Sequence, residues 1–180
     1  MSQGNDSLIL TVIGDDRPGL VESLANTISR HEGNWLESSM SHLAGKFAGI
    51  VSIDIPNDKI ANLEKELASL PDLRVHAETS TPTAATEKPG AQRRLKLSLV
   101  GHDRIGIVRE VSQILAQHAI NVEALTTHTS SAPMSAAILF HAAADLTADG
   151  SLDVQALTAD LELLSNDLMV DITLDESIRT

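Results

Sequence analysis

The chain repeats itself at a fixed spacing, and this internal repeat constrains its fold more than any other sequence feature. Gly14–Val21, with the sequence GDDRPGLV, returns 87 residues later as Gly101–Val108, with the sequence GHDRIGIV. At the same spacing Asn34 corresponds to Asn121, and no gap is needed from the preceding apolar run to these asparagines. Self-similarity of this kind indicates two copies of one structural unit.

Each copy contains the same order of hydrophobic patterns. Apolar runs at 8–13 and 95–100 predict strands, and apolar residues at helical spacing follow each of them. The helical positions are Leu20, Val21, Leu24 and Ile28 in the first copy and Ile107, Val108, Val111 and Leu115 in the second. Further strands are expected near 35–42, 47–55 and 73–79, and near 122–129, 134–142 and 168–174, with a second helix before the last strand of each copy. The order β-α-β-β-α-β predicts an α+β fold of two tandem ferredoxin-like units with antiparallel four-stranded sheets.

The domain limits follow from a change in composition between the copies. Residues 81–92 begin with the sequence TPTAATEKPG, which has no apolar periodicity and is typical of a linker. We therefore expect a first domain over 1–80, a linker over 81–92 and a second domain over 93–180.

The repeated loop has the pattern Gly-x-Asp-Arg-x-Gly and stands between a strand and a helix. This arrangement directs backbone N–H groups and the positive end of a helix dipole towards one point, which suits a small anion such as a carboxylate. Asp16 and Asp103 are expected to cap their helices by accepting a hydrogen bond from the glycine N–H three residues on. Gly33 suits the end of the first helix, whereas Ile120 at the matching position predicts a different end in the second copy.

The two loops, the asparagines that follow them and the β-α-β-β-α-β order together resemble the ACT domain. Because two such units fill nearly the whole chain, the sequence is similar to the glycine cleavage system transcriptional repressor family. This resemblance implies that an amino acid binds where two ACT units meet, between the loop of one unit and the start of the second strand of another. The implied ligand-binding residues are Asp16, Arg17, Pro18, Gly19, Leu20 and Asn34 in copy one, and Asp103, Arg104, Ile105, Gly106, Ile107 and Asn121 in copy two.

Charge and composition exclude several classes of function. The chain carries 25 acidic and 13 basic side chains, a formal net charge of −12, which disfavours direct binding to nucleic acid. It has no cysteine and only 2% aromatic residues, so thiolate chemistry and base stacking are absent. His128 and His141 lie on neighbouring expected strands, but two histidines without a third ligand make a poor metal site. No metal or cofactor is expected.

No catalytic motif is present, so we do not expect an enzyme. The same loop resembles those of the ACT units of formyltetrahydrofolate deformylases and phosphoserine phosphatases, but here a second ACT-like unit takes the place of a catalytic domain. The start of the chain lacks a signal-peptide pattern and no apolar run is long enough to span a membrane, which predicts a cytoplasmic protein without a membrane partner.

These observations predict a regulatory protein that senses a small amino acid, with glycine or serine as first candidates. The resemblance favours a regulator of glycine cleavage transcription that acts through a DNA-binding regulator protein. The alternative is an effector-binding or assembly module of another amino-acid pathway. Ala48, Ile50 and Leu139 place apolar side chains on the sheet faces opposite the helices, which predicts coverage by the sister unit or a second chain and a homo-oligomer.

Overall fold

The computed structural model describes residues 4–80, 92–132, 137–168 and 170–177. The chain divides into two compact units, Met1–Thr86 and Glu87–Thr180. Most of the expected linker, 81–92, lies outside the described residues, so the domain limits 1–80 and 93–180 stay a prediction. None of the helices in the described part has the length and apolar content needed to cross a membrane.

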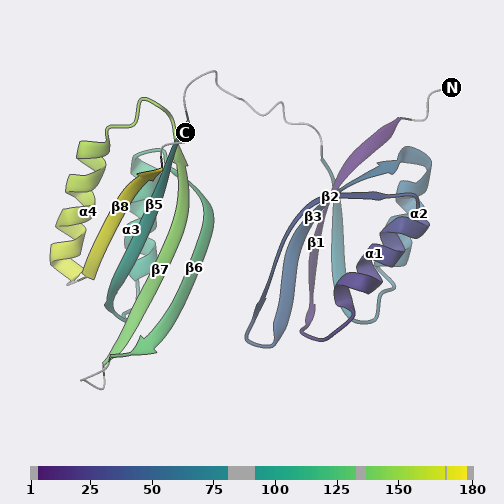
Figure 1. Cartoon of the computed structure of the whole chain (residues 1–180), viewed down its shortest axis with the longest axis horizontal. Coiled ribbons are helices and arrows are strands. Elements are labelled where there is room, and N and C mark those ends of the chain that lie inside the picture. The colour runs from purple at the N-terminus through teal and green to yellow at the C-terminus, as the bar shows by residue number, and fades with distance from the viewer. Residues whose placement is uncertain (1–3, 81–91, 133–136, 169, 178–180) are drawn as a thin grey trace. The chain divides into compact units, whose positions relative to one another are not determined.

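The expected fold class is confirmed, because both units have the order β-α-β-β-α-β (Figure 1). The first unit consists of β1 (Asn5–Asp15), α1 (Leu20–Arg30), β2 (Asn34–Leu43), β3 (Lys46–Pro56), the short 3-10 helix η1 (Asn57–Lys59), α2 (Ile60–Leu67) and β4 (Leu73–Thr79). The second consists of β5 (Arg93–His102), α3 (Ile107–Gln117), β6 (Asn121–Ser131), β7 (Ile138–Ala148), α4 (Val154–Leu168) and β8 (Val170–Ser177).

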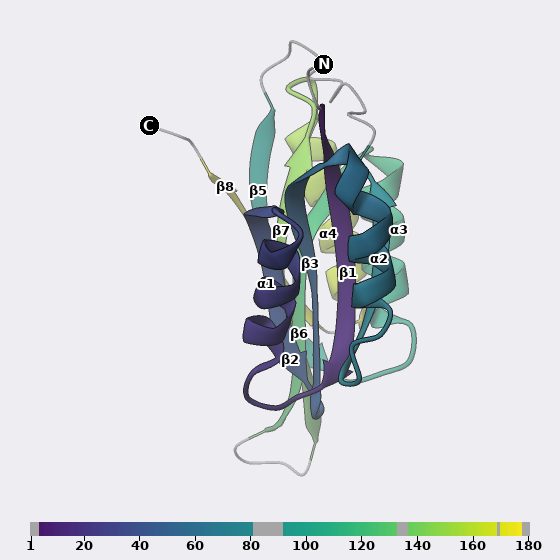
Figure 2. The same ribbon diagram turned by 90° about the vertical axis from the view of Figure 1, so that its right-hand side faces the viewer.

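The strands of each unit form one antiparallel sheet, in the orders β2-β3-β1-β4 and β6-β7-β5-β8. Figure 2 shows α1 and α2 of the first unit lying together on one face of its strands. Alternate residues of the strands meet these helices, as the period of two requires. The resulting cores are separate clusters built around Leu8, Leu10, Leu24, Ile53 and Leu63, and around Leu95, Leu97, Leu115, Leu146 and Leu157.

The opposite sheet face of the first unit carries exposed apolar side chains, as the pattern predicts. Ile50 is 52% exposed and Ile13 is 47% exposed. Val21 and Val108, which the helical spacing also places on the buried stripe, are instead 46% and 42% exposed. Each valine follows the first buried residue of its helix and lies at the edge of the stripe of side chains that faces the sheet.

The β6–β7 hairpin is longer than the sequence pattern suggests. The ladder continues to the pair Ser131 and Ile138, and the N–H of Ala132 bonds to the carbonyl of Ala137 at 2.9 Å. The expected third strand over 134–142 begins instead at Ile138 after four residues that lie outside the description, and continues to Ala148. Alanines and an aspartate make up most of its second half, and their weak strand propensity hid the true end.

The extra length of this hairpin changes the correspondence between the copies. His141 pairs with Val100, and Ala48 pairs with Ile13, the residue that corresponds to Val100. The structural equivalent of His141 is therefore Ala48, and not Asp54 as the constant spacing of 87 implies. The ring of His141 stacks on that of His128, with 4.5 Å between the ring centroids, as their places on neighbouring strands allow.

The ends of α1 and α3 are alike, so the expected difference at Ile120 is wrong. Glu32 and Ala119 adopt left-handed φ values of 61° and 53°. The next N–H then bonds back into the helix, from Gly33 to Ile28 at 3.0 Å and from Ile120 to Leu115 at 2.9 Å. The left-handed position lies one residue before the glycine, which leaves Ile120 free to pack into the core.

Candidate functional site

The loop between β1 and α1 has the same backbone conformation as the loop between β5 and α3. Gly19 and Gly106 adopt φ values of 93° and 97°, a left-handed conformation that side chains disfavour. The N–H of Asp16 bonds to the carbonyl of Gly45, and that of Asp103 to the carbonyl of Ile138, both at 2.9 Å. A tether to the neighbouring hairpin therefore fixes both loops where they leave the sheet.

Neither aspartate caps its helix, which corrects the sequence-based expectation. The helices begin at Leu20 and Ile107, with Gly19 and Gly106 at the N-cap positions and no side-chain cap on either. The left-handed glycine turns the chain into the helix, and its carbonyl accepts the first helical hydrogen bond. The first-turn N–H groups of both helices therefore have no side-chain acceptor within the described residues, and they remain available to a ligand or to water.

The loop residues differ in exposure. The side chains of Leu20 and Ile107 are buried in the two cores, at 5% and 3% exposure, so these residues offer a ligand only their backbone. Ile105, which takes the place of Pro18, is fully exposed. Beside the first loop lies a small cavity of about 90 Å³, and its wall includes Arg17, Pro18, Gly19, Leu20 and Ser23.

The two loop arginines form different ion pairs. Arg17 reaches out of its loop to Asp72, which precedes β4. Arg104 turns towards its own helix and binds Glu110, with a second contact from Nη1 to Oε1 at 3.4 Å. The Nε of Arg104 is buried and makes no hydrogen bond within the described residues. The first loop is thus tied to the end of the sheet, whereas the second is tied to its helix.

The hydrogen bond from Arg104 holds the pKa of Glu110 below its ordinary value, with Arg109 contributing less. A lowered folded-state pKa stabilises the fold above the unfolded-state value, and that stabilisation is lost as the pH falls through the folded value. We predict that Arg104→Gln raises the Glu110 pKa in an NMR titration and weakens the loss of stability of the second unit in acid. Arg109→Gln, the control, should raise this pKa less. An equal shift in both variants would contradict the assignment.

The two asparagines lie far from the loops of their own units. Asn34 stands opposite Asp54, which in turn pairs with Ser7 near the start of β1, whereas the loop follows Asp15 at its end. Eight residues of strand separate these ends by about 26 Å. A single unit therefore does not bring its asparagine to its loop, and Asn121 is placed in the same way at the start of β6.

Two further histidines occupy matching places that link the helices of each unit. His31 bonds to Glu66 of α2 at 2.6 Å, and His118 bonds to Asp160 of α4 at 2.8 Å. Both histidines stand at the C-cap of their helix, so these contacts have a structural role. Within the described part of the chain, no group of three or more His, Asp or Glu side chains is arranged to hold a metal ion.

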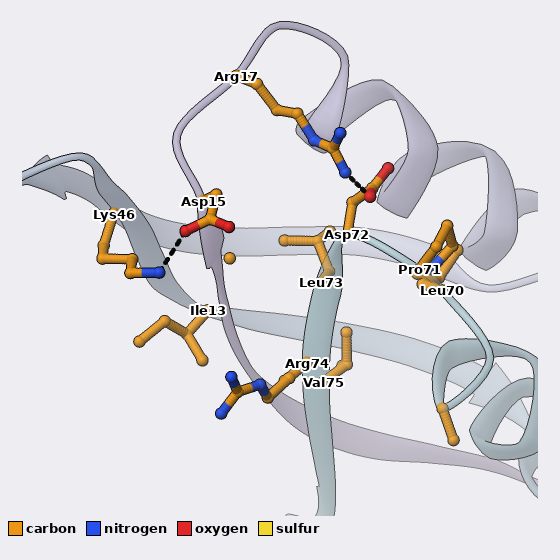
Figure 3. Close-up of a pocket in the computed structure, with 12 residues that line it drawn as sticks. Ile13, Asp15, Arg17, Lys46, Leu70, Pro71, Asp72, Leu73, Arg74 and Val75 are labelled. Atoms are coloured by element: carbon orange, nitrogen blue, oxygen red, sulfur yellow. Dashed lines mark hydrogen bonds and ion pairs between the residues drawn. The ribbon is translucent and has the colours of Figure 1, made fainter.

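Sequence reasoning missed Asp15, Lys46, Asp72 and Arg74, which line one cavity with Arg17 in the first unit (Figure 3). Lys46 forms an ion pair with Asp15 across the β1–β3 ladder. The outward positions of Lys46 and Arg74 on their strands are a signal in the sequence, but Asp72 is brought to Arg17 only by the path of the chain after α2.

The chain is similar to known proteins in both sequence and structure. Residues 6–77 match the family model of the ACT domain. A UPF0237 protein of Methanocaldococcus jannaschii is 36% identical over an alignment of 62 residues, which covers 33% of this chain and 69% of that protein.

Two solved structures match nearly the whole chain. A protein of unknown function from Galdieria sulphuraria matches with a TM-score of 0.84 and 26% identity, over 97% of this chain and all of that one. A candidate glycine cleavage system transcriptional repressor matches with a TM-score of 0.69 and 20% identity, over 97% of this chain and 99% of that one. At 20% identity the second likeness shows the fold alone.

Proposed function

Because this chain belongs to the ACT domain family, we propose that it is a regulatory protein that senses a small amino acid through its two repeated loops. The observation that carries the proposal is the shared loop geometry: a left-handed glycine, an uncapped helix start and an arginine occur together in both units. Backbone N–H groups at a helix start favour an anion, and the carboxylate of an amino acid meets that requirement.

The position of the asparagines supports a site that two ACT units complete. Asn34 and Asn121 are exposed and stand at the strand ends remote from their own loops. An asparagine therefore meets a loop only if a second unit, of this chain or of another copy, provides one of them. The amide both donates and accepts hydrogen bonds, so it suits the ammonium and carboxylate groups of one amino acid.

The finer proposal is a regulator of glycine cleavage transcription, with glycine or serine as the effector. It is supported by the tandem order of the units and by the whole-length likeness to the candidate repressor. A net charge of −12 opposes direct DNA binding, so the regulator would act through a DNA-binding protein whose affinity changes when the effector binds. We propose further that it works in the cytoplasm as a homo-oligomer and has no catalytic activity of its own.

Binding of glycine or serine should raise the melting temperature of the full chain. An effector at about 100 times its Kd adds roughly 2.7 kcal/mol of stability, and a thermal-shift series over the amino acids measures this. Asn34→Ala and Asn121→Ala should reduce the shift. Asn26→Ala is the matched control, because Asn26 is an exposed asparagine within α1.

The sensor proposal fails if no amino acid changes the melting curve and the Asn34 and Asn121 variants bind a partner regulator as the parent does. Binding of an amino acid of another pathway, with glycine and serine inactive, would favour the alternative of an effector-binding module outside glycine metabolism. A gel shift with the purified chain alone tests the expected absence of direct DNA binding.

A further inference from the structure

The first unit contains a cavity of about 530 Å³ beside the loop, on the side that faces β4 rather than α1. Figure 3 shows its charged side chains, which come from the end of β1 and the loop after it, the start of β3 and the segment from α2 into β4. They are Asp15, Arg17, Lys46, Asp72 and Arg74. Segments distant in the sequence therefore converge here on one small surface.

These five groups leave one positive charge unbalanced. Lys46 pairs with Asp15, and Arg17 pairs with Asp72. The guanidinium of Arg74 has no hydrogen bond or ion pair in the described part of the chain, and it lies next to Ile13, its partner across the β1–β4 ladder (Figure 3). A planar guanidinium offers two parallel N–H donors, which match the two oxygens of a carboxylate.

The ion pair of Asp15 and Lys46 on the other side of the cavity leaves no charge free there. The pKa of Asp15 is lowered, chiefly by its hydrogen bond from Lys46, so Asp15 stays ionised near neutral pH and keeps Lys46 engaged. Of the three cations in this cavity, Arg74 is therefore the one whose binding capacity is unused.

The cavity also has an apolar part. Ile13 is 47% exposed on the sheet face that also carries Arg74, its partner in the β1–β4 ladder. Leu70 and Val75 line the cavity too, but they pack against the core on the helix side of the sheet. An apolar body against Ile13 removes hydrocarbon surface from water, which favours a ligand with more than a bare anionic group.

The second unit does not repeat this chemistry. By the register of its sheet, His102 and Leu139 stand where the first unit has Asp15 and Lys46. Asp171 pairs with Val100 in the register that Arg74 has with Ile13. The pairing of Asp15 with Lys46 is therefore a property of the first unit and not of the shared fold.

We propose that this cavity binds a small organic anion, with a carboxylate paired to the guanidinium of Arg74 and an aliphatic body against the exposed side chain of Ile13. The site lies next to the one proposed for the amino acid, which uses the backbone at the start of α1, and Arg17 lines both. A ligand in the cavity would lie next to the ion pair of Arg17 and Asp72 and would alter it. The first unit would thereby respond to a second metabolite.

The test is a backbone-amide NMR titration of the full chain with sodium isovalerate, a branched aliphatic carboxylate. We expect shifts centred on Ile13, Gly14 and Arg74, with the amides of the second unit unchanged. Arg74→Gln should weaken binding by about tenfold or more, the loss expected for a charge-assisted hydrogen bond. Arg94→Gln removes the same charge from an exposed strand position in the second unit and should leave binding unchanged.

Three comparison probes decide the chemistry. Isoamyl alcohol, which has the same body without the charge, and acetate, which has the charge without the body, should both bind more weakly than isovalerate. Inorganic phosphate binding more tightly than isovalerate would overturn the carboxylate assignment. The proposal is also overturned if isovalerate produces no localised shifts, or if Arg74→Gln, with its melting temperature retained, binds isovalerate as the parent does.

Discussion

Leu24→Ala is expected to lower the free energy of unfolding of the first unit by about 2–5 kcal/mol, the usual range for truncating a fully buried leucine. Leu24 is completely buried in the middle of α1, within the core of its unit. Its loss leaves a cavity between the helix and the sheet. The effect reaches the candidate site, because α1 carries the loop glycine and the free N–H groups at its start.

Chemical denaturation followed by hydrogen exchange measures this effect unit by unit. The control is Val21→Ala, three residues away on the same helix and 46% exposed, which should change stability by no more than about 0.5 kcal/mol. Amides of α3 and β5 should keep their protection, because the two core clusters share no described residue. If Leu24→Ala lowers the free energy of unfolding by less than Val21→Ala does, the packing of Leu24 does not hold α1 on the sheet.

Gly14→Ala should destabilise the first unit by about 1–3 kcal/mol, the range for inserting atoms into a filled space. A β-carbon at this position would lie 2.3 Å from the carbonyl oxygen of Asp72 and 3.0 Å from a methyl group of Leu73. The start of β4 must therefore move away from β1. That movement also displaces Asp72 from Arg17, so the loop conformation and the cavity beside it should change together.

Gly4→Ala is the matched control, because its β-carbon would meet only the side-chain nitrogen of Asn57, at an ordinary 3.7 Å. Denaturant melts of the two variants, with amide shifts of Arg17 and Arg74 as local probes, separate a steric effect from the general effect of losing a glycine. Equal stability of the two variants would show that β4 approaches β1 less closely than described.

The sequence predicts most of the fold because its strongest signals are local and occur twice. Apolar runs ended by glycine mark β1 and β5, and leucines spaced by four mark the buried sides of the helices. The ends of elements were less predictable. The true length of β7 depends on its pairing with β6, and a ladder can extend through residues of weak strand propensity when a partner strand is already in place.

The candidate site, like the fold, was predictable from the sequence only in part. Gly19 and Gly106 were identified from their repetition, and their left-handed backbone accounts for it. The capping role assigned to Asp16 was wrong, because the pattern of a capped helix start and that of a glycine-turned start share the same residues. Only the observed hydrogen bonds separate the two.

By itself, the sequence determined that there are two units, the order of their elements and the position of the repeated loops, because periodicity and repetition are written along the chain. The tertiary structure alone decided which charges meet. Arg17 and Arg104 occupy the same place in the repeat, yet one pairs with Asp72 and the other with Glu110. Long side chains choose partners by distance in space, and the path of the chain after α2, which no local pattern encodes, places Asp72 within reach of Arg17.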